Sequence, residues 1–311
     1  RDTVLLNPHD FPAHHVAYYF KKYVRDIPSV WQVNELPFMR WPPEWEMDID
    51  PRFHNAPPRA SRLLKWFFYS VKRRYDRSFV RAQNAITVFD SAHQKTVKKY
   101  LKKESFIAHS GVDSHRFKFL ERTPPGNDFS ILTSGIFLSY RRFEDIIQAL
   151  WILVDWGYNP CLTIVGEYNT DKKYHQALRN LADELNVSDR VVMVGRVSDE
   201  ELQRLLRTHH IFVFPHLQSQ AISVYEAMST GLPTIAARVP GAYETLTGGA
   251  DAILIPPKDP TAMSQAIKNI VDNPELYKRI SAAGAKLVGE RFSWRNYTKE
   301  MMEAFESVLP Q

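Results

Sequence analysis

Cysteine and long apolar runs are scarce in this chain of 311 residues. Its single cysteine, Cys161, cannot form a disulfide within the chain, and the apolar residues 162–165 beside it predict a buried strand position rather than a reactive thiol. No apolar run approaches the roughly 20 residues that a transmembrane helix needs, and no signal peptide is visible at the start. Histidines and carboxylates do not cluster at metal-ligand spacing, and no internal repeat is present. We therefore expect a globular protein that is soluble or peripheral to a membrane and holds no metal.

Positive charge is in modest excess, and one part of the chain holds much of it. The formal net charge is +5 and the pI is about 9.1, with basic residues dominating between Arg59 and Lys103. Within residues 63–80 an aromatic block has basic flanks, which fits either an interfacial helix on anionic lipid or a core helix with a solvated basic face. Nucleic acid is not expected as a partner, because the aromatic residues form one block instead of spaced stacking platforms.

Residues 1–112 predict a first α/β domain of short elements. Strands are expected at 3–6, 30–33, 85–89 and 105–108, with helices at 13–23 and 91–100. The Pro- and Trp-rich stretch 37–58 is too long to be a mere connection. Residues 113–128, which include Pro124, Pro125 and Gly126, predict the connection to a second domain.

Strands and helices alternate regularly over residues 129–290, which predicts a second domain with a parallel, doubly wound sheet. Strands are expected at 130–134, 161–165, 191–194, 211–214, 234–237 and 252–255. Helices are expected at 144–156, 173–185, 199–208, 223–230, 260–272, 275–290 and 297–308. The last segment, 291–311, is expected to pack back toward the first domain.

The stretch 211–244 is the most informative part of the chain. Its apolar strand is stopped by Pro215, a helix begins near Ser223, and Gly231 followed by Pro233 ends that helix. A helix N-terminus at the carboxyl end of a parallel strand offers free backbone N–H groups and a positive dipole end, which suit a diphosphate. The carboxylate of Glu226, about one turn further on, is placed to accept hydrogen bonds from a ribose diol.

Glu226-Ala227-Met228 followed by Gly231-Leu232-Pro233 resembles the signature of the retaining glycosyltransferases of family 4. In that family a Glu, seven residues and a second Glu precede an Ala-Met-x-x-Gly-x-Pro run. The similarity continues through Gly111-Val112-Asp113, Val165-Gly166-Glu167 and Gly241 with Glu244. It implies the GT-B fold, in which two Rossmann-like doubly wound domains face a cleft. Relatives begin with a strand and a Gly-rich loop that this chain does not show, so we expect the first domain to lack its opening strands.

The resemblance also assigns residues to the diphosphate and the sugar. After Gly135 the family places an Arg and a Lys; the Arg position holds Ile136, so Arg141 and Arg142 are expected to bind the diphosphate. Surface arginines at a helix start are the alternative. Gln218 replaces the first Glu of the paired motif, which implies a contact with the donor sugar but without the charge.

Further donor contacts are expected from the backbone amides of Ala221, Ile222 and Ser223, although the Ser223 side chain could instead cap the helix. Arg196 either stacks on the base or is a solvated loop arginine. Asn34 stands where relatives often carry a histidine. His9, His14 and His15 either line the cleft or are surface or capping histidines.

The resemblance implies a retaining, metal-independent hexosyltransferase in which the leaving diphosphate accepts the proton of the acceptor. We expect a UDP- or GDP-sugar donor, no cofactor, a glycan or lipid-linked acceptor, and a cytoplasmic location, either soluble or peripheral at the inner membrane face. The alternative is a degenerate GT-B protein that binds a sugar nucleotide without catalysis. The missing Gly-rich loop, Asn34 and Gln218 motivate that alternative.

Overall fold

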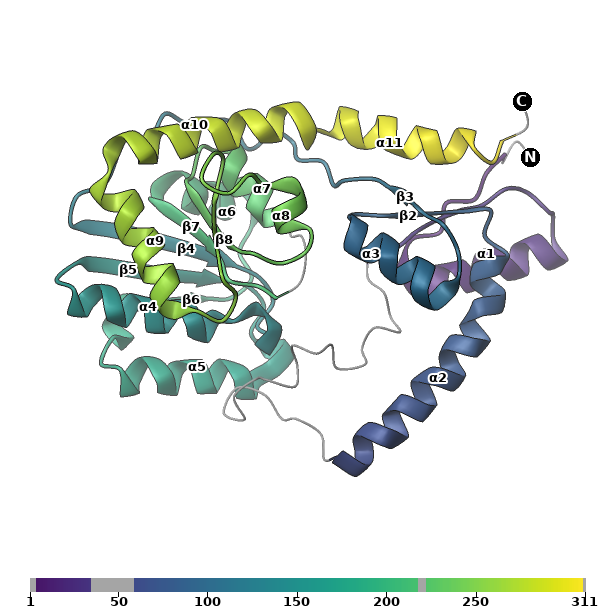
Figure 1. Cartoon of the computed structure of the whole chain (residues 1–311), viewed down its shortest axis with the longest axis horizontal. Coiled ribbons are helices and arrows are strands. Elements are labelled where there is room, and N and C mark those ends of the chain that lie inside the picture. Colours follow the sequence, from purple (N-terminus) through teal and green to yellow (C-terminus); the bar gives the residue numbers. More distant parts are fainter. Residues whose placement is uncertain (1–3, 35–58, 218–221, 310–311) are drawn as a thin grey trace. The chain divides into compact units, whose positions relative to one another are not determined.

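The computed structural model describes residues 4–34, 59–217 and 222–309, and the chain divides into two compact units (Figure 1). Unit 1 contains the described residues 4–34, 59–111 and 294–309. Unit 2 contains the described residues 112–217 and 222–293. Each unit has its own parallel sheet and its own apolar core.

Unit 1 is built on a three-stranded parallel sheet in the order β1-β2-β3. Its strands are β1 (Val30–Gln32), β2 (Ala85–Val88) and β3 (Phe106–Ile107). The helices are α1 (Asp10–Tyr23), α2 (Arg59–Arg81), α3 (Ser91–Thr96), which continues as a π-helical turn η3 (Val97–Leu101), and α11 (Trp294–Glu306). The core is formed by β-strand side chains and by one face of α2 and η3: Trp31, Val33, Val80, Ile86, Val88, Val97 and Leu101.

The strand expected at residues 3–6 is wrong in its described part, because only isolated bridges are present there. Leu6 pairs with Ser29 and His9 pairs with Gln32, both in parallel. The Gln32 amide donates to the Pro8 carbonyl, but Pro8 has no N–H to give in return. The ladder beside β1 therefore stays incomplete.

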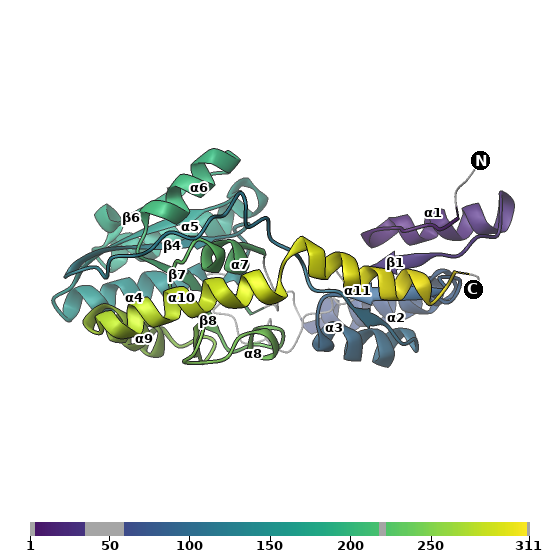
Figure 2. The same cartoon turned by 90° about the horizontal axis from the view of Figure 1, so that it is seen from above.

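Helix α11 returns to unit 1 from the far end of the chain and lies against β2 and β3 (Figure 2). Ala304 is buried in a small cluster with Val30 and Ala85. The backbone N–H and the ring of His109, which follows β3, both bond to the Glu300 carboxylate, the ring nitrogen at 2.9 Å. Residues almost 200 positions apart in sequence thus complete one core.

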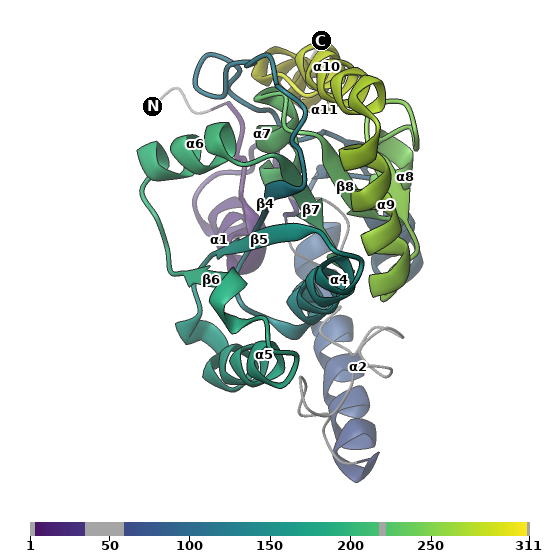
Figure 3. The same ribbon diagram turned by 90° about the vertical axis from the view of Figure 1, so that its left-hand side faces the viewer.

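Unit 2 contains a six-stranded parallel sheet in the order β6-β5-β4-β7-β8-β9 (Figure 3). The strands are β4 (Asp128–Ser134), β5 (Asn159–Val165), β6 (Val191–Val194), β7 (Ile211–Phe214), β8 (Thr234–Ala237) and β9 (Ile253–Ile255). One face is covered by α6 (Asp199–Thr208), α7 (Ile222–Ser229) and α10 (Pro274–Arg291), and the other by α4 (Phe143–Asp155), α5 (Lys172–Glu184) and α9 (Pro260–Asp272). Short turns connect them: η4 (Ser139–Arg141), η5 (Asn169–Asp171), η6 (Ser188–Arg190) and α8 (Ala242–Thr245). The doubly wound sheet expected for this part of the chain is confirmed.

Local capping residues set where several helices of unit 2 begin. The side chains of Asp171, Ser198, Asp259 and Asn273 each accept a hydrogen bond from a backbone N–H three residues further on, at the starts of α5, α6, α9 and α10. Proline follows the cap directly in α9 and α10, where its missing N–H has no cost. These starts can therefore be read from a few adjacent residues.

Residues 113–128, expected as a connection between domains, lie in unit 2 and pack on the ends of two helices. The Ser229 hydroxyl donates to the Phe117 carbonyl, and the buried Arg122 guanidinium donates to four backbone carbonyls at the ends of α6 and α7: Leu206, Arg207, His209 and Thr230. Helix C-termini leave carbonyls without intrahelical donors, so this single side chain satisfies both ends.

Cys161 is exposed, which corrects the expectation of a core cysteine. Exposure alternates along the first residues of β5, where Asn159 and Cys161 face outward and Pro160 and Leu162 are buried. Only one side of the sheet is covered at this amino end of the strand. The adjacent apolar residues that predicted burial lie further along, under the helices.

Candidate active site

The sheet of unit 2 reverses its winding direction between β4 and β7. The chain moves outward from β4 to β5 and β6, then returns to the other side of β4 at β7 and continues to β8 and β9. In doubly wound sheets ligands bind outside the carboxyl ends of the strands at this reversal. The segments that leave β4 and β7 here are residues 135–142 and 215–217, followed by α7.

Gly135 and Gly166 form the floor of this region, where two backbones touch. A Cβ on Gly166 would lie 1.8 Å from the Gly135 carbonyl oxygen, so no side chain fits there. A Cβ on Gly135 would lie 3.1 Å from Cε1 of His216 and 3.3 Å from Cδ of Arg141. The missing side chain of Gly135 therefore lets both residues approach the end of β4.

Arg141 and His216 join the two segments. The Arg141 guanidinium donates from one terminal nitrogen to Nδ1 of His216 over 2.6 Å, and it lies over the Tyr140 ring at 4.9 Å. His216 is fully buried, with its ring 3.7 Å from that of Phe214. Burial, reinforced by the Arg141 charge, holds the pKa of His216 well below its usual value, so the ring is neutral and Nδ1 accepts. Among the described residues, Nε of Arg141 has no hydrogen-bond partner.

Arg142 points elsewhere, which corrects the expectation that both arginines face the diphosphate. Its Nε and one terminal nitrogen donate to the Asp145 carboxylate at 2.9 and 2.5 Å, and the other terminal nitrogen lies 2.8 Å from a Glu144 oxygen. Arg142 is buried in the left-handed backbone region, with φ 56°, directly before α4. That backbone turns the side chain onto the first turn of α4. Its guanidinium anchors this helix start and leaves Arg141 as the arginine at the strand ends.

Glu226 is half-buried in α7, one turn into the helix. Burial raises the pKa of its carboxyl, while the nearby Arg116 opposes that rise and Asp199 adds to it. Arg116 itself is paired with Asp199 over 2.6 Å. The Glu226 carboxylate therefore belongs to a cluster of charged side chains, with Arg116 from residues 113–117 and Asp199 from the start of α6.

The segment after β6 places Arg196 in solvent, and the residue before it, Gly195, lies beside an aromatic ring. A Cβ on Gly195 would lie 3.0 Å from the ring of Tyr168, which stacks on His175 at 4.7 Å. Arg196 has no ring contact among the described residues. Tyr168, half-buried in the segment after β5, offers a second flat surface for a base at the same edge of the sheet.

Asn34 lies in unit 1 and is held by the first residue of α1. Its backbone N–H and its side-chain amide donate to the two carboxylate oxygens of Asp10 at 2.7 and 2.8 Å. Gln32 donates to its side-chain oxygen at 3.2 Å. The residue therefore anchors the turn after β1 to α1.

The remaining expected donor residues fall around the start of α7. Gln218 and Ala221 lie outside the described residues. Ile222 is exposed and Ser223 half-buried in the first turn of the helix, where backbone N–H groups have no intrahelical acceptor. Their amides remain the expected diphosphate donors.

Sequence reasoning missed His216 and Arg116. His216 directly follows the strand β7 and Pro215, a position where a polar side chain reaches the edge of the sheet. Arg116 follows Asp113 in the segment that was expected to be a connection. No sequence spacing marks either residue, because each is identified only by a contact with a residue distant in the sequence: His216 with Arg141, and Arg116 with Asp199.

Two results concern metals and membranes. The sequence showed no group of metal ligands, whereas the fold brings together His14 and His15 of α1 and Asp76 of α2. Among the residues that the structure describes, no helix is both long and apolar enough to cross a bilayer.

A comparison with known protein families gives a match that lies within unit 2 of the chain. The model of the glycosyl transferases group 1 matches residues 115–287, more than half of the chain. LpsD of Rhizobium meliloti, a lipopolysaccharide core biosynthesis glycosyltransferase, is 28% identical over 183 residues, 58% of this chain and 50% of its own length. CapM of Staphylococcus aureus, a capsular polysaccharide biosynthesis glycosyltransferase, is 23% identical over 244 residues, 74% of this chain and 63% of its own length. The chain thus spans half to somewhat under two thirds of these relatives.

Solved structures match both units. HepE of Anabaena, in complex with UDP and glucose, superposes with a TM-score of 0.76 at 14% identity, over 98% of this chain and 78% of its own. Sucrose-phosphate synthase from Thermosynechococcus elongatus gives 0.75 at 17% identity, over 98% of this chain and 73% of its own. The likeness confirms the expected GT-B fold with its parallel sheets. With the family match over the second unit, the chain belongs to the group 1 glycosyl transferases.

Proposed function

We propose that this protein transfers a hexose from a UDP- or GDP-sugar to a glycan or lipid-linked acceptor, with retention of the anomeric configuration. The observation that carries the proposal is the Arg141 to His216 contact, which sets a cation at the reversal of the sheet in unit 2. The buried, neutral ring of His216 fixes the position of the Arg141 guanidinium without neutralising the charge of that guanidinium. Fixed positive charge is what a leaving diphosphate requires.

In this proposal, different groups contact the diphosphate, the ribose, the sugar and the base. Arg141 and the free amides at the start of α7 stabilise the charge that develops on the leaving diphosphate. Glu226 accepts hydrogen bonds from the ribose hydroxyls, and Gln218 orients the sugar. The leaving diphosphate takes the proton from the acceptor, so the proposal needs neither a side-chain base nor a metal. Arg196 and Tyr168 provide surfaces for the base.

UDP is the first donor nucleotide to test, because one solved structure with this fold holds UDP and glucose. Purified protein is incubated with a panel of UDP- and GDP-sugars, and release of the nucleotide is measured with Glu226→Ala as the control. We expect turnover of at least one donor by the parent protein and a large loss in the variant. A folded parent that binds nucleotide yet turns over no donor would favour the non-catalytic alternative.

Unit 1 carries an exposed apolar surface, which we call the aromatic surface. It consists of Val16, Tyr19 and Tyr23 of α1 with Phe67, Phe68, Val71 and Tyr75 of α2. Phe68 is 63% exposed and Tyr23 is 70% exposed, and the rings of Tyr19 and Tyr75 both pack against Phe79, at 5.8 and 4.9 Å, where the two helices meet. Lys22 lies over the Tyr23 ring, and the sequence around Tyr75 is rich in Lys and Arg.

We propose that the aromatic surface docks on anionic lipid, which would place the enzyme at the cytoplasmic face of a membrane beside a lipid-linked acceptor. Aromatic side chains with basic neighbours are the composition of interfacial helices. Co-sedimentation with phosphatidylglycerol and phosphatidylcholine vesicles tests it. We expect binding to the anionic vesicles only and its loss in Phe67→Ser/Phe68→Ser. Trp151→Ser, which changes an exposed aromatic residue of α4 in unit 2, is the matched control. Equal binding by all three proteins would exclude this surface.

A further inference from the structure

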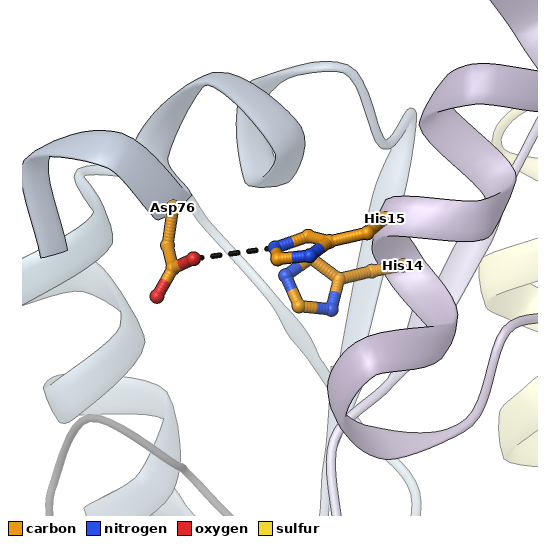
Figure 4. A group of neighbouring side chains, drawn as sticks. All are labelled: His14, His15 and Asp76. Atoms are coloured by element: carbon orange, nitrogen blue, oxygen red, sulfur yellow. Dashed lines mark hydrogen bonds and ion pairs between the residues drawn. The ribbon is translucent and has the colours of Figure 1, made fainter. Parts of the chain in front are cut away.

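Two adjacent histidines of α1 and one carboxylate of α2 meet inside unit 1 (Figure 4). One ligand atom from each of His14, His15 and Asp76 lies within 4.8 Å of the other two. One of these contacts joins Nε2 of His15 to an oxygen of Asp76 at 3.2 Å. His15 and Asp76 are 61 residues apart in the sequence, so only the fold creates this cluster.

The surrounding side chains hold the cluster in place. His14 is fully buried, and its ring stacks on Trp31 at 4.2 Å with an interplanar angle of 24°. The ring of His15 lies 4.0 Å from that of Phe79, and Gln83 donates to the His14 carbonyl at 3.0 Å. The Asp76 side chain is 1% exposed and that of His15 is 19% exposed. The site is thus enclosed, and His15 is the most exposed of the three residues.

The chemistry of the three groups suits a metal ion. Imidazole coordinates a metal ion through an unprotonated ring nitrogen, and each of the two histidines offers one ring nitrogen to this group. Two imidazole nitrogens and one carboxylate oxygen form a ligand set typical of zinc and its first-row neighbours. Three protein ligands leave a fourth position for water.

We propose that His14, His15 and Asp76 bind one divalent transition-metal ion of the zinc type, which ties α1 to α2. For metal–ligand distances of about 2.0–2.1 Å, tetrahedral ligand atoms lie roughly 3.3 Å apart. Because all pairs lie within 4.8 Å, the widest pair must close by at most roughly 1.5 Å, which small side-chain rotations supply. The site lies in unit 1, outside the strand ends assigned to the donor, so it stabilises structure and does not depend on the proposed transfer reaction.

A simple His15 to Asp76 ion pair is the competing interpretation, and it makes no use of His14. The test therefore measures binding and not activity. The full chain, stripped with a chelator and dialysed, is titrated with ZnCl₂ by calorimetry, and with CoCl₂ while visible absorption is recorded. We expect one equivalent to bind, tetrahedral Co²⁺ bands, and a higher melting temperature with Zn²⁺.

The variants are Asp76→Asn and His15→Gln, which keep the shape of the side chain, whereas a change at His14 would disturb Trp31. Outer-shell substitutions already cost ten- to hundredfold in metal affinity, so loss of a ligand should weaken binding by more than about a hundredfold. His109→Gln is the matched control, because His109 is paired with Glu300 at 2.9 Å in the same unit. It should bind like the parent protein.

Several results would overturn the site. These are no zinc binding by the parent chain, binding that survives in both variants with their folds intact, or loss in the His109 control as well. X-ray absorption of the zinc-loaded protein must also show two imidazole ligands; a single imidazole would remove His14 from the site.

Discussion

His216→Phe is the substitution that most directly tests the assignment of Arg141. Phenylalanine keeps a ring of similar size against Phe214 and Phe143, but it removes the Nδ1 acceptor that receives the 2.6 Å hydrogen bond from Arg141. The guanidinium then loses its fixed place beside Gly135. A hydrogen bond that involves a charged group is worth about 1.5–3 kcal/mol.

If that free energy is lost from the transition state, kcat/KM for the donor falls by roughly 10- to 150-fold, since each 1.36 kcal/mol corresponds to a factor of about ten. This loss is measured by steady-state kinetics with whichever sugar nucleotide the parent protein turns over, and we expect most of it in kcat. The control is His210→Phe. His210 accepts from the Ser130 backbone N–H near the amino end of β4, at the opposite edge of the same sheet.

A double-mutant cycle with Arg141→Gln decides whether His216 acts through Arg141. If it does, His216→Phe has little further effect once Arg141 is replaced. Full additivity of the two losses, or less than a threefold change in a folded His216→Phe protein, would refute the positioning role.

Three further predictions use the same protein. The pKa of His216 is held low in the folded protein, so at acid pH the unfolded chain binds one proton more than the folded chain at this residue. The parent protein should therefore lose stability relative to His216→Phe as the pH falls below about 6.5, by up to about 1.4 kcal/mol per pH unit. Urea unfolding at several pH values measures this difference. Equal pH slopes would contradict this. Glu226→Gln should raise the donor KM roughly tenfold or more while leaving circular dichroism unchanged, and an unchanged KM would remove the ribose role. Arg122→Met removes the side-chain donor shared by four helix-end carbonyls and should lower the unfolding free energy by about 3 kcal/mol; a change under about 0.5 kcal/mol would argue against the bridging role.

Much of unit 2 follows from local sequence patterns. Strands β6, β7 and β8 and helices α6 and α9 lie where the alternation of apolar and polar residues predicts them. Their starts carry Ser198 and Asp259 as caps, and Pro215 and Gly231 end elements, so each boundary depends on neighbours in sequence. The winding of the sheet, and with it the edge where the site lies, follows from that order of elements.

The contacts of single side chains required the tertiary structure. Arg141 and Arg142 are adjacent and chemically alike, yet a left-handed backbone at Arg142 turns one guanidinium onto Asp145 while the other reaches His216, 75 residues away. The same holds for His14, His15 and Asp76, and for Cys161 at an uncovered strand end. Periodicity and capping are short-range properties that a sequence displays, whereas a partner distant along the chain is chosen by strand order and packing.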